Sequence, residues 1–578
     1  VFSSMERGII RACEDLCSAR MLYPEAVGCL LSYIQFIAPP SSDEILFDVA
    51  GSATMALCET ILGLPFEGYK ALMKWASTIY PTSELFVTML IKPLMGQLEN
   101  SLSGTIDNDG VEHVPRSRRV APLLVALLLW IEKVAWLDDR DHPLAKPEDF
   151  YCQAISTIDA RDLYEDLYHF KRASKSERAS RFFFSAFPFL IEPSTKRNLL
   201  QIESEMQMMK TITQNVTIDA ESGEYQIDPF FELEVDREHL LEDALGKVRE
   251  AETSDLCRKL RIIFKGEEGL DAGGVTKEFF QLLSEDLFDV NSSLWSNRYG
   301  SEMTWFNADC TWDDEGFELV GVLVGLALYN GVLLDVRFPM AVYRKLLSLP
   351  LGLEDMVDEE VKQGLYLLLN YEGDDVEDVF CLSFDVSWMA MGKEQTIELK
   401  RNGSEIPVTN ENREEYVLLY VSWLLVDSIE SQWQAFEKGI MRVMGNSSFN
   451  IFSPEELELL VVGTPELDFK ALESNTSYEG GFDESSMVVR NFWRFIHEAD
   501  RETQLQFLKF ATGSSMAPIG GLAAIDFKIQ RAGPDSPQLP TSHTCFNTLL
   551  LPDYGDNYEK LESRLGRAVL ECEGFGLE

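Results

Sequence analysis

A change in the spacing of apolar residues near position 226 constrains the fold of this chain more than any other feature. Before it, apolar side chains recur at helical spacing, as in Leu85–Leu94. After it, short β-like runs such as Leu260–Phe264 and Phe380–Phe384 alternate with helical patterns. We therefore expect an irregular all-α region over residues 1–225, followed by an α+β region.

The α+β region is itself divided near residue 463. A helix that opens on proline and glutamate is predicted over Pro454–Leu460, and Gly463, Thr464 and Pro465 follow it. Glycine permits unusual backbone angles and proline restricts the residue before it, so residues 463–465 are a predicted hinge. A last unit follows over residues 466–578, with helices expected around 484–499 and 556–572.

Charge and cysteine content exclude several classes of protein. The formal net charge of −46 opposes binding to nucleic acid and to anionic membranes. Ten widely spread cysteines are too sparse for a disulfide scaffold, which favours a reducing compartment, cytoplasmic or nuclear. The longest apolar run, Val120–Ile131, is too short to cross a bilayer of ~30 Å and predicts a buried helix.

No segment of the sequence predicts a metal or cofactor site. Cys13 and Cys17 lack a second pair of ligands, and Asp107–Gly110 has unsuitable residues at the ligand positions of a calcium loop. The glycine-rich segment Gly266–Gly274, with Lys277 nearby, lacks the spacing of a phosphate-binding loop. We expect neither metal nor cofactor.

One cysteine lies in a setting that suggests chemistry. Cys545 sits in the proline-anchored polar segment Leu539–Asn547, directly before the apolar run Leu549–Leu551. A cysteine in a loop between apolar elements is positioned for access, although a free cysteine is more often a buried structural residue. Cys572 is the rival nucleophile, but it falls in register with a helical apolar stripe and is predicted to be core.

These features resemble the catalytic end of a HECT-type ubiquitin ligase. The resemblance covers about residues 226–578 and is closest to the subfamily of the Angelman-syndrome ligase, which papillomavirus hijacks. The matching segments, in chain order, are Gly269–Val275, Phe338–Met340, Ile406–Asn412, Pro518–Gly521 and the segment around Cys545. The resemblance implies a bilobal catalytic domain, with a large mostly helical lobe (226–462) joined by the hinge to a small α/β lobe (466–578).

The resemblance also implies roles for residues near the chain end. Cys545 would carry ubiquitin as a thioester, and Phe575, fourth from the end, would support transfer to lysine. In an extended loop, His543 and Cys545 would share one side and Thr544 the other. His543 would then lower the thiol pKa or place the thiol, or it would only shape the loop.

A second set of residues forms a helical stripe followed by an acidic loop and an apolar run. From pattern alone, ordinary core is the better interpretation. By resemblance, they line the pocket that grips the ubiquitin-conjugating enzyme: Val361, Leu365, Leu368, Tyr371, Phe380, Leu382 and Tyr416. Pockets of this kind usually bury an aromatic anchor of the partner.

We therefore predict a ubiquitin-protein ligase whose partners are ubiquitin, a conjugating enzyme and protein substrates, with nucleic acid and membranes excluded. A homo-oligomer is compatible with the sequence. Residues 1–225 would bind substrates or regulate the lobes. Two alternatives stay open: a cysteine hydrolase acting on ubiquitin conjugates, which needs a histidine base, and a non-catalytic adaptor.

Overall fold

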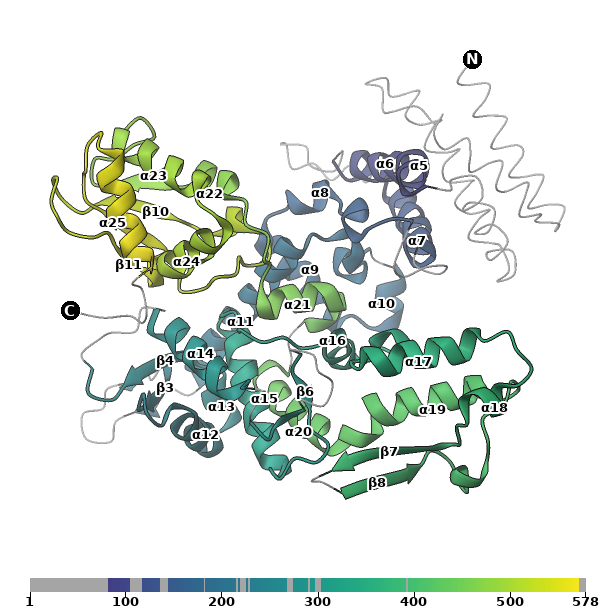
Figure 1. The fold of residues 1–578 in the computed structure, drawn as a ribbon. Helices are drawn as coiled ribbons and strands as arrows, with labels where there is room; N and C mark the ends of the chain where they lie inside the picture. The colour runs from purple at the N-terminus through teal and green to yellow at the C-terminus, as the bar shows by residue number, and fades with distance from the viewer. Residues whose placement is uncertain are drawn as a thin grey trace, which may run out of the picture. The chain divides into compact units, whose positions relative to one another are not determined.

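A computed structural model describes residues 82–103, 117–135, 144–180, 182–214, 217–218, 225–226, 229–267, 274–289, 292–296, 303–390, 393–445 and 448–570 (Figure 1). The chain divides into two compact units, residues 1–199 and 200–578, which are described separately. Cys13, Cys17 and the acidic segment Asp107–Gly110, which were considered as metal ligands, lie outside the described residues.

The described part of the first unit is helical, as expected. Its longer helices are α6 (Lys92–Ser103), α7 (Ser117–Ala135), α9 (Ala160–Arg172) and the start of α11 (Pro193–Gln214). The shorter ones are α5 (Ser83–Phe86), η2 (Val87–Ile91), η3 (Pro147–Phe150), α8 (Gln153–Ser156), α10 (Lys175–Ser180), η4 (Phe184–Ala186) and η5 (Pro188–Leu190).

Two predictions for this unit are confirmed. The stripe Leu85–Leu94 is helical, and the wide π-turn of η2 directly precedes Pro93, where a regular turn would clash with the proline ring. The apolar run Val120–Ile131 lies within α7, where Leu124, Val125 and Leu128 are fully buried. Among the described helices, none is long and apolar enough to span a membrane.

The second unit is α+β. The strands of its first part form four two-stranded sheets: β1 (Thr217–Ile218) with β2 (Tyr225–Gln226), β3 (Phe230–Val235) with β4 (Lys259–Phe264), β5 (Trp295–Ser296) with β6 (Trp305–Phe306), and β7 (Asp385–Ala390) with β8 (Lys393–Glu398). Of these four pairs among the described residues, β3–β4 is parallel and the other three are antiparallel. The expected strand at Leu260–Phe264 is therefore confirmed, while the pair β1–β2 lies at the end of the region predicted to be all-α.

Helices fill most of the same part. They are α12 (Leu240–Glu250), α13 (Thr253–Leu256), α14 (Gly274–Leu287), α15 (Asp314–Tyr329), α16 (Met340–Leu346), α17 (Glu359–Asn370), α18 (Val376–Phe380), α19 (Arg413–Leu425), α20 (Glu430–Met444) and α21 (Pro454–Val462), with short turns η6 (Leu353–Asp355), η7 (Gly403–Glu405), η8 (Asp427–Ile429) and η9 (Phe449–Ile451).

Helices α15 and α20 pack closely because glycines face each other across them. A Cβ at Gly321 would collide with the carbonyl oxygen of Phe436, and one at Gly439 with that of Glu318. Helix α15 is buried on nearly every side, which explains its almost continuous apolar sequence. This pair forms the centre of the part of the unit before the hinge.

The prediction of a strand over Phe380–Phe384 is wrong. Phe380 ends helix α18, and Cys381 turns the chain in the left-handed conformation with a φ of 49°. The N–H of Phe384 then donates to the carbonyls of Gly403 and Ile406, and β7 begins at Asp385. The apolar run is therefore split between a helix end and a turn, which its β-like composition does not reveal.

The last part is a small α/β body around one four-stranded sheet. Its elements are α22 (Phe469–Asn475), β9 (Ser477–Glu479), α23 (Met487–Glu498), α24 (Arg501–Thr512), η10 (Leu522–Ala524), β10 (Lys528–Arg531), β11 (Thr541–His543), η11 (Thr544–Phe546), β12 (Thr548–Leu551) and α25 (Tyr558–Leu570). The strand order is β11-β12-β10-β9, and only the β11–β12 pair is antiparallel.

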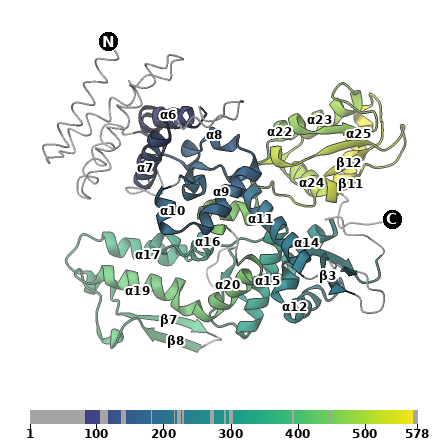
Figure 2. The same ribbon diagram turned by 180° about the vertical axis from the view of Figure 1, so that it is seen from behind.

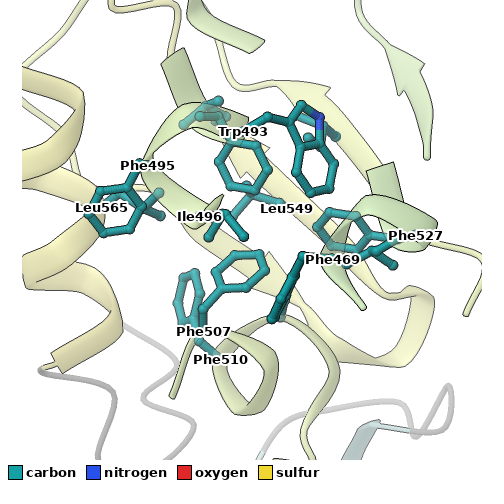
Figure 3. Packing of buried hydrophobic residues seen from close by; sticks show 14 of the residues in the cluster. Phe469, Trp493, Phe495, Ile496, Phe507, Phe510, Phe527, Leu549 and Leu565 are labelled. Carbon is teal, nitrogen blue, oxygen red and sulfur yellow. The ribbon is translucent and has the colours of Figure 1, made fainter. Parts of the chain in front are cut away.

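The core of this body lies between the sheet and its helices (Figure 3). Ile529 and Leu549 of the sheet meet Phe492 and Phe507 of the helices, and all four are fully buried. The predicted stripe on the last helix is confirmed, since Leu561, Leu565 and Ala568 are buried on α25. The helices expected around 484–499 and 556–572 correspond to α23 and α25, as far as the latter is described.

Candidate active site

The backbone of Cys545 lies in a tight turn, η11, which joins β11 to β12. The two strands pair antiparallel, with His543 opposite Thr548. Asn547 closes the turn in the left-handed conformation, with a φ of 46°, and its N–H donates to the carbonyl of Thr544 at 3.4 Å. Because residues 544–546 form a 3₁₀ turn, the alternation expected for an extended loop does not apply, which corrects the predicted sidedness of His543 and Thr544.

Hydrogen bonds anchor both sides of the turn to neighbouring elements. The Ser542 hydroxyl donates to the Phe510 carbonyl of α24 at 2.5 Å. The carbonyl of Asn547 accepts from the N–H of Lys528 at the start of β10 at 3.0 Å. The backbone that carries the cysteine is therefore fixed by both a helix and the sheet.

The residues beside Cys545 differ sharply in exposure. Thr544 is 4% exposed, whereas the Phe546 side chain is 59% exposed and His543 is exposed. A large apolar side chain that folding leaves mostly exposed favours contact with another molecule. Thr544 instead helps to seat the turn.

A lysine distant in sequence also contacts this turn. The Nζ of Lys277, on α14, donates to the carbonyl of Thr512 at 3.0 Å, the carbonyl of Thr544 at 3.2 Å and the Oδ1 of Asn547 at 3.3 Å. Sequence reasoning considered Lys277 only as a phosphate ligand. No local signal predicts this contact, since 267 positions separate Lys277 from Thr544.

Phe575 and Cys572 lie outside the described residues, which end at Leu570. The roles predicted for them therefore stay predictions. The hydrolase alternative needs a histidine base, and His497 of the small α/β body lies on α23, where its Nε2 is 2.7 Å from Glu473 Oε2 and its ring stacks on Trp493. These contacts give His497 a structural role on that helix.

The predicted docking residues converge around α17, α18 and α19. Val361, Tyr371, Phe380 and Leu382 are half-buried. The Tyr371 and Phe380 rings meet edge to face, with centroids 5.4 Å apart. The Tyr371 hydroxyl donates to Asp375 Oδ1 at 2.8 Å, which raises the pKa of the phenol. An aromatic surface with a fixed shape is the result.

The other three predicted docking residues are buried. Leu365, Leu368 and Tyr416 are 5%, 0% and 3% exposed, and burial raises the pKa of the Tyr416 phenol. Tyr416 packs edge to face on Phe384 with centroids 5.4 Å apart. These three side chains are therefore part of the core, as the pattern alone favours.

Polar contacts set the position of the segment that carries the aromatic pair. Arg413 Nη1 donates to the carbonyls of Leu368 and Tyr371, at 3.1 and 2.6 Å. Asn410 Nδ2 donates to the carbonyl of Gly373 at 3.0 Å. Sequence reasoning missed the strongly exposed apolar residues on these helices, Leu367 (68%), Val379 (51%) and Leu418 (70%), whose exposure has no sequence signal.

The predicted hinge has one glycine that its conformation requires. Gly463 follows α21 with a φ of 87°, and a Cβ there would lie 2.5 Å from the carbonyl oxygen of Ala517. On the near side, the carbonyl of Val461 accepts from the N–H of Leu334 at 2.9 Å. On the far side, the carbonyl of Pro465 accepts from Arg501 Nη2 at 3.1 Å. The residue Val461 before Gly463 is therefore bonded to the part of the unit that precedes the hinge, and Pro465 after it is bonded to the small α/β body.

Within the described part of the chain, no group of three or more histidine, cysteine, aspartate or glutamate side chains is arranged to hold a metal ion. The Cys545 turn consists of a backbone held by hydrogen bonds, an exposed aromatic neighbour and a nearby cation. The small α/β body agrees with the fold that the resemblance to a HECT-type ligase implies.

Comparison with known proteins agrees with this class. Residues 281–578 match the HECT-domain (ubiquitin-transferase) family, so the chain belongs to that family. It is 37% identical over 455 residues to the probable E3 ubiquitin-protein ligase HECTD2 of Mus musculus, covering 75% of this chain and 57% of that protein.

Two further relatives are also named as probable E3 ubiquitin-protein ligases. The probable E3 ubiquitin-protein ligase HERC4 of Homo sapiens is 36% identical over 397 residues, 68% of this chain and 38% of that protein. The probable E3 ubiquitin-protein ligase HUL4 of Eremothecium gossypii is 33% identical over 457 residues, 74% of this chain and 54% of that protein. The chain thus spans less than two thirds of the length of these relatives.

Proposed function

We propose that this chain is a ubiquitin-protein ligase, which accepts ubiquitin from a conjugating enzyme as a thioester on Cys545 and transfers it to lysines of protein substrates. The observation that carries the proposal is the anchored turn with Cys545 at its centre, within a domain of the HECT family. The exposed Phe546 beside it supports the approach of a second protein.

The chemistry needs little beyond position. In the first step, the Cys545 thiolate attacks the thioester carbonyl of the charged conjugating enzyme, and the thiolate of that enzyme leaves. In the second, a substrate amine attacks the new thioester, an isopeptide bond forms, the amine loses a proton and the Cys545 thiolate leaves. The first step exchanges one thioester for another and is nearly isoenergetic, so orientation carries most of the catalysis.

We place the conjugating-enzyme site on the surface made by Val361, Tyr371, Phe380 and Leu382. The edge-to-face pair of Tyr371 and Phe380, with Leu365, Leu368 and Tyr416 buried on the neighbouring helices, supports this assignment. Such rigid aromatic surfaces bind a partner at low entropic cost, because few side-chain rotamers are lost on binding.

A hinge at Gly463 would let Cys545 visit two positions. The segment before it is bonded to Leu334 and the segment after it to Arg501, which favours a bend at residues 462–463 over one at Thr464 or Pro465. A cysteine that meets first a donor and then an acceptor needs such freedom.

We further propose that residues 1–225 hold substrates or regulate the lobes, and that the chain acts in the cytoplasm or nucleus. The resemblance over residues 226–578 is the ground for proposing a placement near the subfamily of the Angelman-syndrome ligase. Ubiquitination by this chain with a conjugating enzyme that also serves that subfamily tests the placement.

The test of the proposed function is a charging reaction. The full chain is mixed with ubiquitin, activating enzyme and a panel of conjugating enzymes, then run on non-reducing gels. We expect a thiol-sensitive adduct that is lost in Cys545→Ala and replaced by a thiol-resistant ester in Cys545→Ser. Cys310→Ala, a half-buried cysteine elsewhere in the same unit, is the matched control and should charge normally. Absence of the adduct with every enzyme of the panel overturns the proposal.

A further inference from the structure

Lys277 joins two parts of the second unit that the predicted hinge separates. It lies on α14, before the hinge, and its ammonium group reaches the turn that carries Cys545. Its acceptors, the Thr544 carbonyl and Asn547 Oδ1, flank the cysteine on both sides, and the third is the Thr512 carbonyl at the end of α24. A single cation thus holds both flanks of the turn and the helix behind it.

The surroundings explain why a long cationic side chain suits this place. Carbonyls at the C-terminal end of a helix carry partial negative charge and lack partners within the helix, so α24 favours a cation there. Gly513 ends α24 with a φ of 83°, and the Lys277 stem passes close to it, since a Cβ on Gly513 would lie 3.5 Å from Lys277 Cδ. The buried Phe279, Phe280 and Leu283 fix the helix from which Lys277 extends.

The contact with Lys277 leaves the residues beside Cys545 exposed. Lys277 bonds to backbone carbonyls and one amide oxygen, while His543 stays exposed and Phe546 is 59% exposed. A contact that served only to block access to Cys545 would bury His543 and Phe546. The docked arrangement therefore leaves the turn accessible to an incoming acceptor.

The docked turn is also remote from the proposed conjugating-enzyme surface. In both views of the ribbon, α14 lies at one end of the part before the hinge, and α17 and α18 lie toward the other end (Figure 1, Figure 2). A thioester delivered by an enzyme on α17 and α18 requires the turn to leave α14. The contact with Lys277 thus belongs to a different stage from charging.

We infer that Lys277 is a positioning residue for the second half-reaction: it docks the charged Cys545 turn onto α14 while the thioester is passed to a lysine. This inference rests on the proposed function and adds to it a residue with a role in one step only. Charging does not need the contact, and discharge does.

The test separates the two half-reactions in single-turnover assays of the full chain. Lys277→Met keeps the length of the side chain and removes its donors. We expect its charging rate to stay within about twofold of the unmodified chain, and its discharge to free lysine to slow by about tenfold or more, as for loss of a charged hydrogen-bond donor. Lys277→Arg keeps the cation and should recover most of the discharge rate.

Further variants distinguish loss of the Lys277 contact from a general loss of folding. Asn547→Gly removes one acceptor at a position where glycine tolerates the left-handed backbone, and should slow discharge less than Lys277→Met does. The double variant should be less than additive, because both changes break the same contact. Lys438→Met removes a lysine that bonds to Glu318 on α15 and should change neither half-reaction.

Amide hydrogen exchange tests the Lys277 contact without ubiquitin. Amide hydrogen exchange over residues 541–551 should be faster in Lys277→Met than in the unmodified chain, with unchanged exchange in α15 and α20. Equal exchange and equal discharge in the two chains overturn the inference. Faster charging with unchanged discharge in Lys277→Met also overturns it, because the contact would then hold the uncharged chain in an inactive arrangement. If the unmodified chain forms no thioester while exchange responds to Lys277→Met, the proposed function fails and the contact stands.

Discussion

Thr464 and Ala517 form a two-hydrogen-bond bridge directly after the predicted hinge. The N–H of Thr464 donates to the carbonyl of Ala517 at 2.7 Å, and the N–H of Ala517 donates to that of Thr464 at 3.0 Å. This bridge fixes Thr464 to the small α/β body, so a bend at the proposed hinge would fall at the residues before it. Gly463, with its positive φ, is the first of these.

Replacing Gly463 tests this arrangement. Gly463→Ala forces an alanine into the left-handed region and towards the Ala517 carbonyl, so we expect a loss of about 1–3 kcal/mol in the free energy of unfolding and slower ubiquitin transfer. Denaturant unfolding and single-turnover transfer measure the two effects. Gly481→Ala is the matched control, because Gly481 also has a positive φ (95°) but open space around its Cα. Equal effects of the two changes would contradict the steric argument.

The docking surface is tested at its aromatic pair. Phe380→Ala removes the ring that meets Tyr371 edge to face, and we expect the Kd for the conjugating enzyme to rise by about tenfold or more. Titration calorimetry with the uncharged enzyme measures the change. Met487→Ala, an exposed apolar residue at the start of α23, should leave the Kd unchanged. An unchanged Kd in Phe380→Ala would move the docking site elsewhere.

The core of the small body is tested with two phenylalanines of opposite exposure. Phe507 is fully buried beside Phe492 and Phe527, so Phe507→Ala should cost about 3–5 kcal/mol of stability. Phe546 is 59% exposed, and Phe546→Ala should change stability by no more than about 0.5 kcal/mol. Denaturant unfolding followed by tryptophan fluorescence compares them. Similar losses in both variants would refute the assigned burial.

Glu458 links stability to pH. Partial burial, aided by the nearby charge of Glu455, raises the pKa of its carboxyl above the ordinary value. The folded chain therefore holds this proton more tightly than the unfolded chain, so ionisation destabilises the fold as the pH rises above the ordinary glutamate pKa. Glu458→Gln should stabilise the chain at pH 7 and lose this advantage near pH 4, as measured by Tm against pH.

The exposed Glu405 provides the comparison. Glu405→Gln should shift Tm little at either pH, because its carboxyl is solvated in both states. If Glu458→Gln destabilises the chain at pH 7, its carboxylate makes favourable contacts that outweigh its burial.

Local sequence patterns predicted the elements that depend on neighbouring residues. The stripe on α25, the helix α21 opened by Pro454, and the strand β4 all follow from spacing within about a dozen positions. The segment around Cys545 was singled out in the same way, because a proline-anchored polar run before an apolar strand is a local signal.

The elements that local patterns missed depend on distant partners. Phe380 ends a helix because Cys381 turns the backbone and Phe384 bonds to Gly403 and Ile406. The 3₁₀ turn at Cys545 lies in a local hairpin, but the hydrogen bonds that anchor it come from Phe510, Lys528 and Lys277, which are distant in sequence. Apolar composition alone cannot distinguish these outcomes from a strand or an extended loop.

The sequence by itself determined the change from a helical to an α+β region, helices such as α21 and α25, strand β4, the resemblance to the family and the setting of Cys545, since each is written in residues close along the chain. Only the tertiary structure decided that Lys277 meets Thr544, that Thr464 is tied to Ala517, and that Leu365, Leu368 and Tyr416 are buried. The physical reason is that these relationships join positions far apart in the chain. They exist only once whole elements have packed, and no periodicity along the sequence encodes that packing.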